Sequence, residues 1–129
     1  MLLRTVLRSK IHRATVTEAN VDYIGSLTLD QDLMEAADLA EYEQVAIADL
    51  DNGERLETYV IRGERGSGIV GINGAAALKI RPPHKIIIFC YAQTTQEGLG
   101  DFKPKIVFVD DRNRVTELAR LETPQTRRG

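Results

Sequence analysis

The chain has 129 residues, 43% of them hydrophobic and 28% charged, a balance typical of one soluble globular domain. Its 17 lysines and arginines against 19 aspartates and glutamates give a net charge of −2, which disfavours nucleic acid as a partner because such domains are usually basic. No apolar run approaches the roughly 20 residues of a membrane span, and the N-terminus is too short and too charged for a signal peptide. We therefore expect a single cytoplasmic domain over residues 1–129, with no membrane partner.

Strand-forming residues dominate the chain. Strands are expected at residues 5–7, 11–17, 27–29, 44–50, 55–62, 69–72, 85–91 and 105–109. Asp30 predicts the N-cap of a short helix over residues 31–38, and the turn at 73–77 can open another. Cys90 falls in an apolar run and is expected in the core, and residues after Glu122 are expected to fray. Many short strands with few helical turns predict a mainly β fold, a small barrel with a few short helices.

Conventional catalytic patterns are weak in this sequence. His12 and His84 are the only histidines and lack cysteine partners, so we expect no metal site. A triad from Ser26 and His12 lacks the G-x-S-x-G turn that exposes a nucleophilic serine. The glycine-rich loop at 63–68 lacks the lysine pattern of a phosphate-binding loop.

Two features allow both a structural and a chemical interpretation. Gly25-Ser26 can be a turn, or a peptide bond that the serine hydroxyl attacks; a second pair, Gly66-Ser67, shows that the dipeptide alone does not decide. On the strand after Asn52-Gly53, Arg55 and Tyr59 share one face by the two-residue period. They can converge on a small ligand, or they can belong to a solvated face.

Three stretches carry a resemblance to a known family. They are KIHRATVTEANVDYIGSLTLD at 10–30, NGERLETYVIRGERGSG at 52–68 and NGAAA at 73–77. In their order and spacing they resemble the pyruvoyl-dependent aspartate 1-decarboxylases, over about residues 1–91. The resemblance implies a double-psi β-barrel, assembled as a homotetramer with active sites between subunits. The chain departs from the family pattern at Ala48, where some members carry a large aromatic residue. The smaller alanine is expected to loosen the pocket wall. The chain departs again at residues 81–85, where a Gly-Asp turn is common.

The resemblance also implies a self-processing enzyme, made as a zymogen. Ser26 attacks the carbonyl of Gly25, and cleavage yields a β chain of residues 1–25 and an α chain of residues 26–129. Ser26 becomes a covalent pyruvoyl group, so neither a metal nor pyridoxal phosphate is expected. That group forms a Schiff base with L-aspartate, which loses CO2 to give β-alanine for pantothenate and coenzyme A biosynthesis. A maturation factor is a conceivable further partner.

Site residues follow from matching positions in these stretches. Tyr59 is implied as the proton donor, with Ser26 as the other catalytic residue, and Thr58 as the hydroxyl that supports processing at the Gly25 carbonyl. The implied substrate-binding residues are Lys10, Arg55, Thr58, Gly74, Ala75 and Ala76. Tyr23 and Asn73 match positions near the pocket. The alternative to this enzyme is a noncatalytic β-barrel that binds other proteins, or a relative that no longer processes itself.

Overall fold

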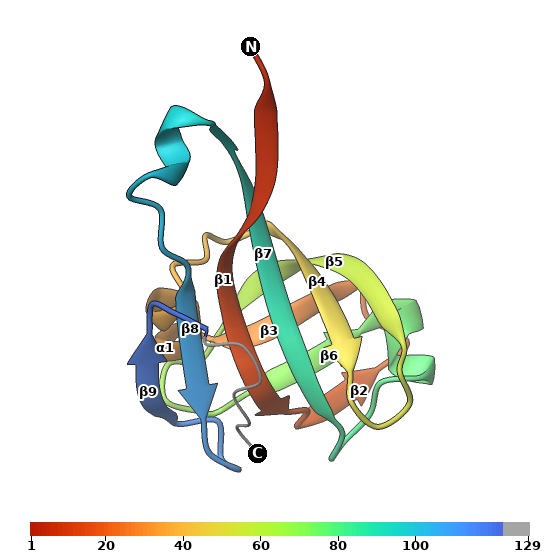
Figure 1. Cartoon of the computed structure of the whole chain (residues 1–129). Coiled ribbons are helices and arrows are strands. Elements are labelled where there is room, and N and C mark those ends of the chain that lie inside the picture. Colours follow the sequence, from red (N-terminus) through yellow and green to blue (C-terminus); the bar gives the residue numbers. More distant parts are fainter. Residues whose placement is uncertain (123–129) are drawn as a thin grey trace.

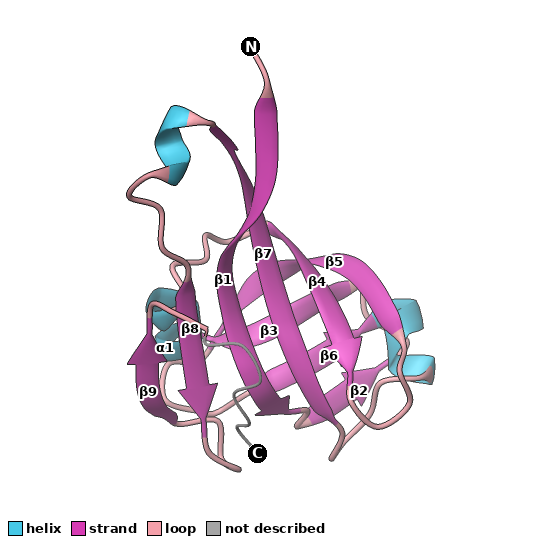
Figure 2. Ribbon diagram, viewed as in Figure 1, coloured by secondary structure: helices cyan, strands magenta, loops and turns pink. Residues whose placement is uncertain are grey.

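The computed structural model describes residues 1–122 and shows a mainly β protein with a few short helices, as expected (Figures 1 and 2). The strands are β1 Leu3–Thr15, β2 Glu18–Asn20, β3 Ser26–Asp30, β4 Gln44–Asp49, β5 Arg55–Gly63, β6 Val70–Asn73, β7 Lys85–Thr95, β8 Lys105–Val109 and β9 Val115–Ala119. The helices are α1 Gln31–Ala36 and two short 3-10 segments, η1 Gly74–Leu78 and η2 Glu97–Leu99.

The described strands form one sheet that folds over itself. Their order is β2-β6-β3-β5-β4-β7-β1-β8-β9, and three pairs are parallel, namely β1 with β8, β2 with β6 and β3 with β5. In Figure 2, strands β1, β7 and β4 cross in front of β3 and β6, so two layers enclose the core. Within residues 1–122, backbone hydrogen bonds do not join the outermost strands β2 and β9, so they do not close the sheet into a barrel.

The core between the layers is aliphatic, as a chain with no tryptophan and three phenylalanines requires. Its largest fully buried side chains are Ile11, Leu27, Leu29, Leu33, Ile47, Ile72, Ile80, Ile86, Ile88 and Ile106. Cys90 belongs to this core, which confirms the prediction for the lone cysteine. Burial of these side chains supplies the main driving force for folding, and it fixes the register of the strands that carry the site.

Differences from the expected elements have local causes. Residues 5–7 and 11–17 are parts of one long strand, β1, which pairs with β7 through two register shifts. Helix α1 ends at Ala36, because Asp38 takes a left-handed backbone conformation with φ 57°. Strand β9 was not predicted, because it is an exposed edge strand without apolar alternation. The expectation of fraying after Glu122 concerns residues 123–129, which lie outside the described part of the chain.

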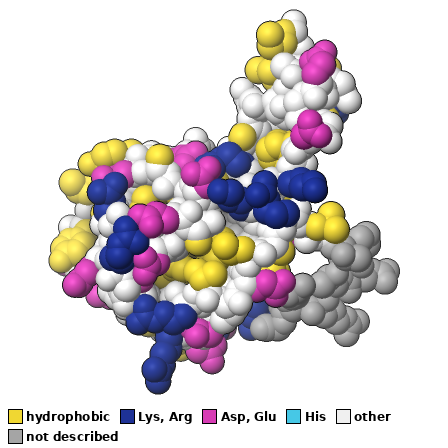
Figure 3. Space-filling model, turned by 90° about the vertical axis from the view of Figure 1, so that its left-hand side faces the viewer, with side chains coloured by type: hydrophobic (Ala, Val, Ile, Leu, Met, Phe, Trp, Pro, Cys, Tyr) yellow, Lys and Arg dark blue, Asp and Glu magenta, His cyan; other side chains and the backbone are white. Residues whose placement is uncertain are grey.

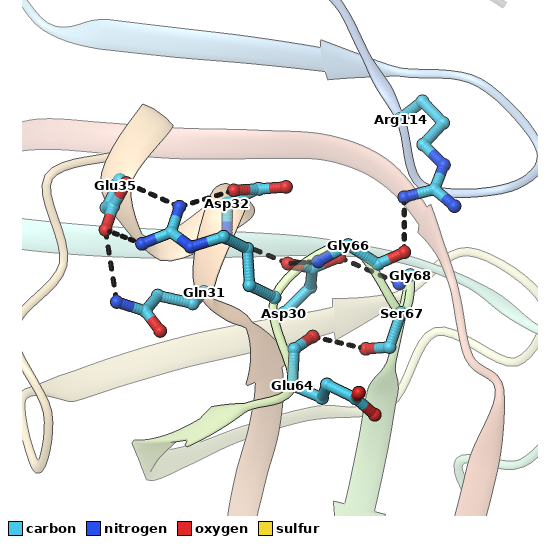
Figure 4. Close-up of polar contacts among 10 residues, drawn as sticks. Asp30, Gln31, Asp32, Glu35, Glu64, Gly66, Ser67, Gly68 and Arg114 are labelled. Carbon is cyan, nitrogen blue, oxygen red and sulfur yellow. Dashed lines mark hydrogen bonds and ion pairs between the residues drawn. The ribbon is translucent and has the colours of Figure 1, made fainter.

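Asp30 ties the end of β3 to both α1 and the glycine-rich loop at 63–68 (Figure 4). Its side chain is buried, with one oxygen accepting from the N–H groups of Asp32 at 2.8 Å and Gly66 at 3.0 Å. The other oxygen accepts from the N–H of Gly68 at 2.8 Å. The predicted N-cap is therefore confirmed, and Asp30 also holds the loop.

Burial opposes ionisation of Asp30, but its hydrogen bonds outweigh that effect. Burial raises the pKa of the Asp30 carboxyl, whereas the N–H groups of Gly68, Asp32 and Gly66 and the charge of Arg114 lower it, and the net shift is downward. Asp30 is thus a buried carboxylate that stays charged at neutral pH. It fixes the C-terminal end of the strand that begins at Ser26.

The surface carries charges of both signs. On the face shown in Figure 3, basic and acidic side chains are interspersed, with an apolar patch between them. None of the helices within residues 1–122 combines the length and the hydropathy needed to cross a membrane.

Candidate active site

The Gly25–Ser26 peptide bond lies where the chain passes from the surface into the core. Residues 21–25 form an exposed turn between β2 and β3, and the side chain of Ile24 is 84% exposed. Ser26 starts β3 and is only 5% exposed. The Ser26 hydroxyl is thereby removed from most solvent, while the preceding carbonyl stays close to the surface.

Asn73 holds the Ser26 hydroxyl from the opposite strand. Ser26 pairs with Asn73 in the antiparallel ladder of β3 and β6. The Asn73 side-chain amide donates to the Ser26 hydroxyl at 3.0 Å and to the Thr28 hydroxyl at 2.9 Å. Ser26 itself donates to the Ile24 carbonyl at 3.3 Å. Two residues on one strand face therefore share one amide group, which fixes where the Ser26 oxygen lies.

Gly74 allows the next turn of the chain to approach the same peptide bond. Its φ is +80°, a conformation that residues with a side chain rarely adopt. A Cβ at this position would lie 2.6 Å from the Cα of Gly25 and 2.9 Å from its nitrogen. The close packing of Gly74 on Gly25 requires a glycine, and it places η1 beside the Gly25–Ser26 bond.

A cavity of about 590 Å³, called here the arginine cavity, opens beside Gly25. It includes seven of the residues predicted for the site or for cleavage, namely Gly25, Arg55, Thr58, Tyr59, Asn73, Ala75 and Ala76. The first half of β5 forms one wall, because β5 pairs with β3 only from Val60 onward and leaves that edge free. Helix η1 forms the facing wall. The fold thus brings four of the six candidate substrate-binding residues, Arg55, Thr58, Ala75 and Ala76, together beside Gly25.

A second cavity of about 540 Å³, the tyrosine cavity, lies on the Ser26 side. Tyr23 and Ser26 line it together with Tyr42, whose ring centroid is 6.3 Å from that of Tyr59. Tyr59 and Asn73 line both cavities. These two residues therefore stand between the spaces that flank the Gly25–Ser26 bond.

Lys10 lies outside both cavities. It stands on β1 opposite Phe89 of β7, with its Nζ 5.9 Å from the centre of the Phe89 ring and 3.4 Å from a carboxylate oxygen of Glu122. Arg55 approaches the same ring, with its Cζ at 5.5 Å. Lys10 is consequently linked to Arg55 through Phe89 and does not face Gly25 across the arginine cavity.

The histidines lie apart from Ser26. His12 packs edge-on against Phe108, with ring centroids 5.6 Å apart, and it lines neither cavity. His84 Nδ1 lies 2.6 Å from the buried Asp49 carboxylate, and Asp51 is close enough to complete a possible metal-binding group. The structure therefore does not assemble the triad of Ser26 and His12, and the expectation of no metal stays a prediction.

The sequence missed several residues of the site. Thr28 shares the Asn73 amide with Ser26, and its two-residue spacing from Ser26 on a strand was a signal that could have found it. Tyr42 and Lys79 line the cavities from segments distant in sequence, where no local pattern marks them. Ala48, expected to loosen the pocket wall, lies opposite Arg55 in the β4–β5 ladder and does not line the arginine cavity.

Comparisons with known proteins agree on one family. The sequence model of the family described as aspartate decarboxylase matches residues 2–116. Proteins named aspartate 1-decarboxylase from Bacillus cereus are 51% identical over 125 residues, covering 97% of this chain and 98% of theirs. Those from Bacillus cytotoxicus and Bacillus thuringiensis are 50% identical with the same coverage.

Fold and site together define a small, mainly β protein in which a Gly-Ser peptide bond borders an open, arginine-lined cavity. This chain belongs to the aspartate decarboxylase family. The resemblance seen in the three sequence stretches is thereby confirmed.

Proposed function

We propose that this chain is a self-processing, pyruvoyl-dependent enzyme that converts L-aspartate to β-alanine and CO2. The relatives named aspartate 1-decarboxylase support the reaction. The observation that carries the proposal is the placement of the Gly25–Ser26 bond. The Ser26 hydroxyl is held by Asn73, and Gly25 borders the cavity lined by Thr58, Tyr59 and Arg55.

Self-processing uses groups that lie around this bond. The Ser26 oxygen bonds to the carbonyl carbon of Gly25, the C–N bond breaks, and the nitrogen becomes the amine of residue 26. Loss of the Cα proton and of the Gly25 carboxylate then leaves dehydroalanine. Water hydrolyses its imine tautomer, releases ammonia and leaves a pyruvoyl ketone. The products are residues 1–25 and 26–129.

Two neighbours fit the needs of that first step. An amide is very stable, so the attacking oxygen must be held in place and the developing oxyanion must receive a hydrogen bond. Asn73 fixes the Ser26 oxygen from the facing strand. Thr58 lines the same cavity as Gly25, and we assign its hydroxyl to the oxyanion. The donor set around residue 26 therefore fits a group formed there.

In the mature enzyme, the pyruvoyl ketone supplies an electrophile that binds the substrate amine and accepts the electron pair left by the departing carboxylate. The arginine cavity supplies the remaining functions. Arg55 presents a planar guanidinium to a carboxylate of aspartate. The backbone N–H groups of Ala75 and Ala76, which line the cavity, and of Gly74 at the start of η1 are assigned to further anion contacts. Tyr59 borders both cavities and is assigned as the acid that protonates the product carbon.

We further propose that the active enzyme is a cytoplasmic homotetramer that supplies β-alanine for pantothenate biosynthesis. Lys10 is assigned to substrate binding, yet it lies outside the cavity that contains Arg55 and Gly25. Tyr23, Ile24 and Tyr42 are large, exposed side chains beside the tyrosine cavity. A neighbouring copy that covers this apolar surface and contributes Lys10 would complete the site.

Turnover of L-aspartate tests the proposed reaction. Purified protein is incubated with heating or in cell extract to allow maturation and is then assayed for β-alanine. The expected result is β-alanine from the wild type and none from Ser26→Ala. Absence of β-alanine from the wild type under all these conditions would contradict the proposal.

A further inference from the structure

The ring of Phe89 lies within reach of both cations that are assigned to substrate carboxylates. The Lys10 Nζ is 5.9 Å and the Arg55 Cζ is 5.5 Å from its centroid. Both distances fall within the range of a cation–π interaction, about 6 Å. Phe89 therefore lies beside two cations at once.

The register of four strands explains this arrangement. Lys10 of β1 lies directly opposite Phe89 of β7, and Phe89 lies opposite Ala46 of β4. Arg55 belongs to β5, one strand farther along, where it is opposite Ala48. Because Ala46 and Ala48 carry only methyl groups on this face, the Arg55 side chain can extend across β4 and reach the ring.

Orientation by the ring has a physical consequence for binding. Lysine and arginine side chains have many rotamers, and fixing them upon binding opposes affinity. Within residues 1–122 Arg55 forms no ion pair, so the Phe89 ring is the contact that orients its guanidinium. A guanidinium held in place before the ligand arrives binds a carboxylate with a smaller loss of entropy.

We propose that Phe89 is a positioning residue for substrate binding, which holds Arg55 in the orientation that receives a carboxylate of a short dicarboxylate and holds Lys10 in the orientation in which it completes the site of a neighbouring copy. The inference rests on the proposed function and deepens it. It assigns Phe89 no part in the cleavage at Gly25, because Phe89 lines neither cavity beside that bond.

Three substitutions on the same sheet test the inference. Phe89→Leu removes the ring but retains an apolar side chain, whereas Phe89→Tyr retains the ring. Tyr91→Leu is the matched control, since Tyr91 stacks on Phe89 with centroids 6.2 Å apart and is not recorded beside either cation. From the usual strength of exposed cation–π contacts, Phe89→Leu should raise KM for L-aspartate about fivefold with little change in kcat. Phe89→Tyr should stay close to the wild type.

A binding measurement separates this inference from the proposed reaction. Titration calorimetry with succinate, a dicarboxylate without an amine, should show a Kd about fivefold weaker for Phe89→Leu and unchanged for Tyr91→Leu. Equal effects of the two leucine substitutions would overturn the inference, as would unchanged KM and Kd in Phe89→Leu, or a loss that Phe89→Tyr fails to restore. If the wild type makes no β-alanine, the reaction fails as proposed, and the succinate titration still decides the role of Phe89.

Discussion

Gly74 packs directly on Gly25, so closely that a methyl group at position 74 would lie 2.6 Å from the Cα of Gly25. The contact joins the turn at the start of η1 to the residue whose carbonyl is the proposed site of attack. The geometry of the Gly25–Ser26 bond therefore depends on a residue 49 positions away in the chain.

Replacing Gly74 should consequently impair processing. Gly74→Ala combines an unfavourable backbone conformation, which costs about 1 kcal/mol or more, with displacement of residues 21–25. We expect cleavage, followed by denaturing mass spectrometry, to slow by about tenfold or more. Gly53→Ala is the matched control, because Gly53 has a similar φ of +77° and nothing within 4 Å of its missing Cβ. Equal cleavage rates in the two variants would show that the Gly74 contact has no role.

The Asn73 amide should support cleavage through its hydrogen bond to Ser26 and not through its hydrogen bond to Thr28. Asn73→Ala removes the hydrogen bond that holds the Ser26 oxygen, and we expect cleavage to slow about tenfold, the equivalent of one lost hydrogen bond of ordinary strength. Thr28→Val removes only the second acceptor and leaves the contact with Ser26. Its cleavage should remain within about threefold of the wild type. The reverse ranking of the two variants would contradict the assignment.

Tyr59 should be needed for turnover but not for cleavage. Tyr59→Phe retains the ring and removes the proton, so we expect complete processing and a fall in kcat of about 10²- to 10⁴-fold. Tyr42→Phe makes the same change in the neighbouring ring of the tyrosine cavity and should retain most activity. A fully active Tyr59→Phe would assign the proton donor to another group.

The stability of the fold should depend on pH through the carboxyl group of Asp30. Its folded-state pKa is lowered, so its contribution to stability is present above the unfolded pKa, about 3.9, and is lost as the pH falls through the folded value. Asp30→Asn should lower the free energy of unfolding at pH 7 by about 2 kcal/mol, because three N–H groups lose their charged acceptor. When urea denaturation is measured at a series of pH values, Asp30→Asn should also reduce the loss of unfolding free energy toward acidic pH.

Asp110 provides a control for this effect. Its pKa is also lowered, by the N–H groups of Arg114 and Arg112, but its side chain is exposed. Asp110→Asn should therefore change both stability and its pH dependence less than Asp30→Asn does. If Asp30→Asn and the wild type lose the same unfolding free energy toward acidic pH, Asp30 does not cause that loss.

Local patterns predicted the elements better than the contacts between them. Alternation and turn residues located most of the strands, and Asp30 was correctly predicted as an N-cap. Strand β9 was missed because an exposed edge strand has no buried face to produce a pattern. The pairing of parallel strands such as β3 and β5 depends on the packing of the whole chain, which no short window encodes.

The same limit applies to the site. Resemblance supplied Gly25, Ser26, Thr58, Tyr59 and Asn73. In the structure Asn73 contacts Ser26, and Thr58 and Tyr59 line the cavities beside the Gly25–Ser26 bond. The approach of Arg55 to Phe89 could not be predicted, since it requires the register of β5 on β4 and of β4 on β7. That the short side chain of Ala48 leaves Arg55 room to reach Phe89 likewise follows only from that register.

In the proposed function, the Gly25–Ser26 bond is cut and residue 26 becomes a ketone. Intact-mass measurement under denaturing conditions tests this processing directly, on the wild type and on Ser26→Ala, before and after borohydride reduction. We expect fragments 1–25 and 26–129 from the wild type, with reduction adding hydrogen only to the second, and an intact Ser26→Ala chain. An uncut wild type after heating and incubation in cell extract would contradict the proposed function, as would a 26–129 fragment that still begins with serine.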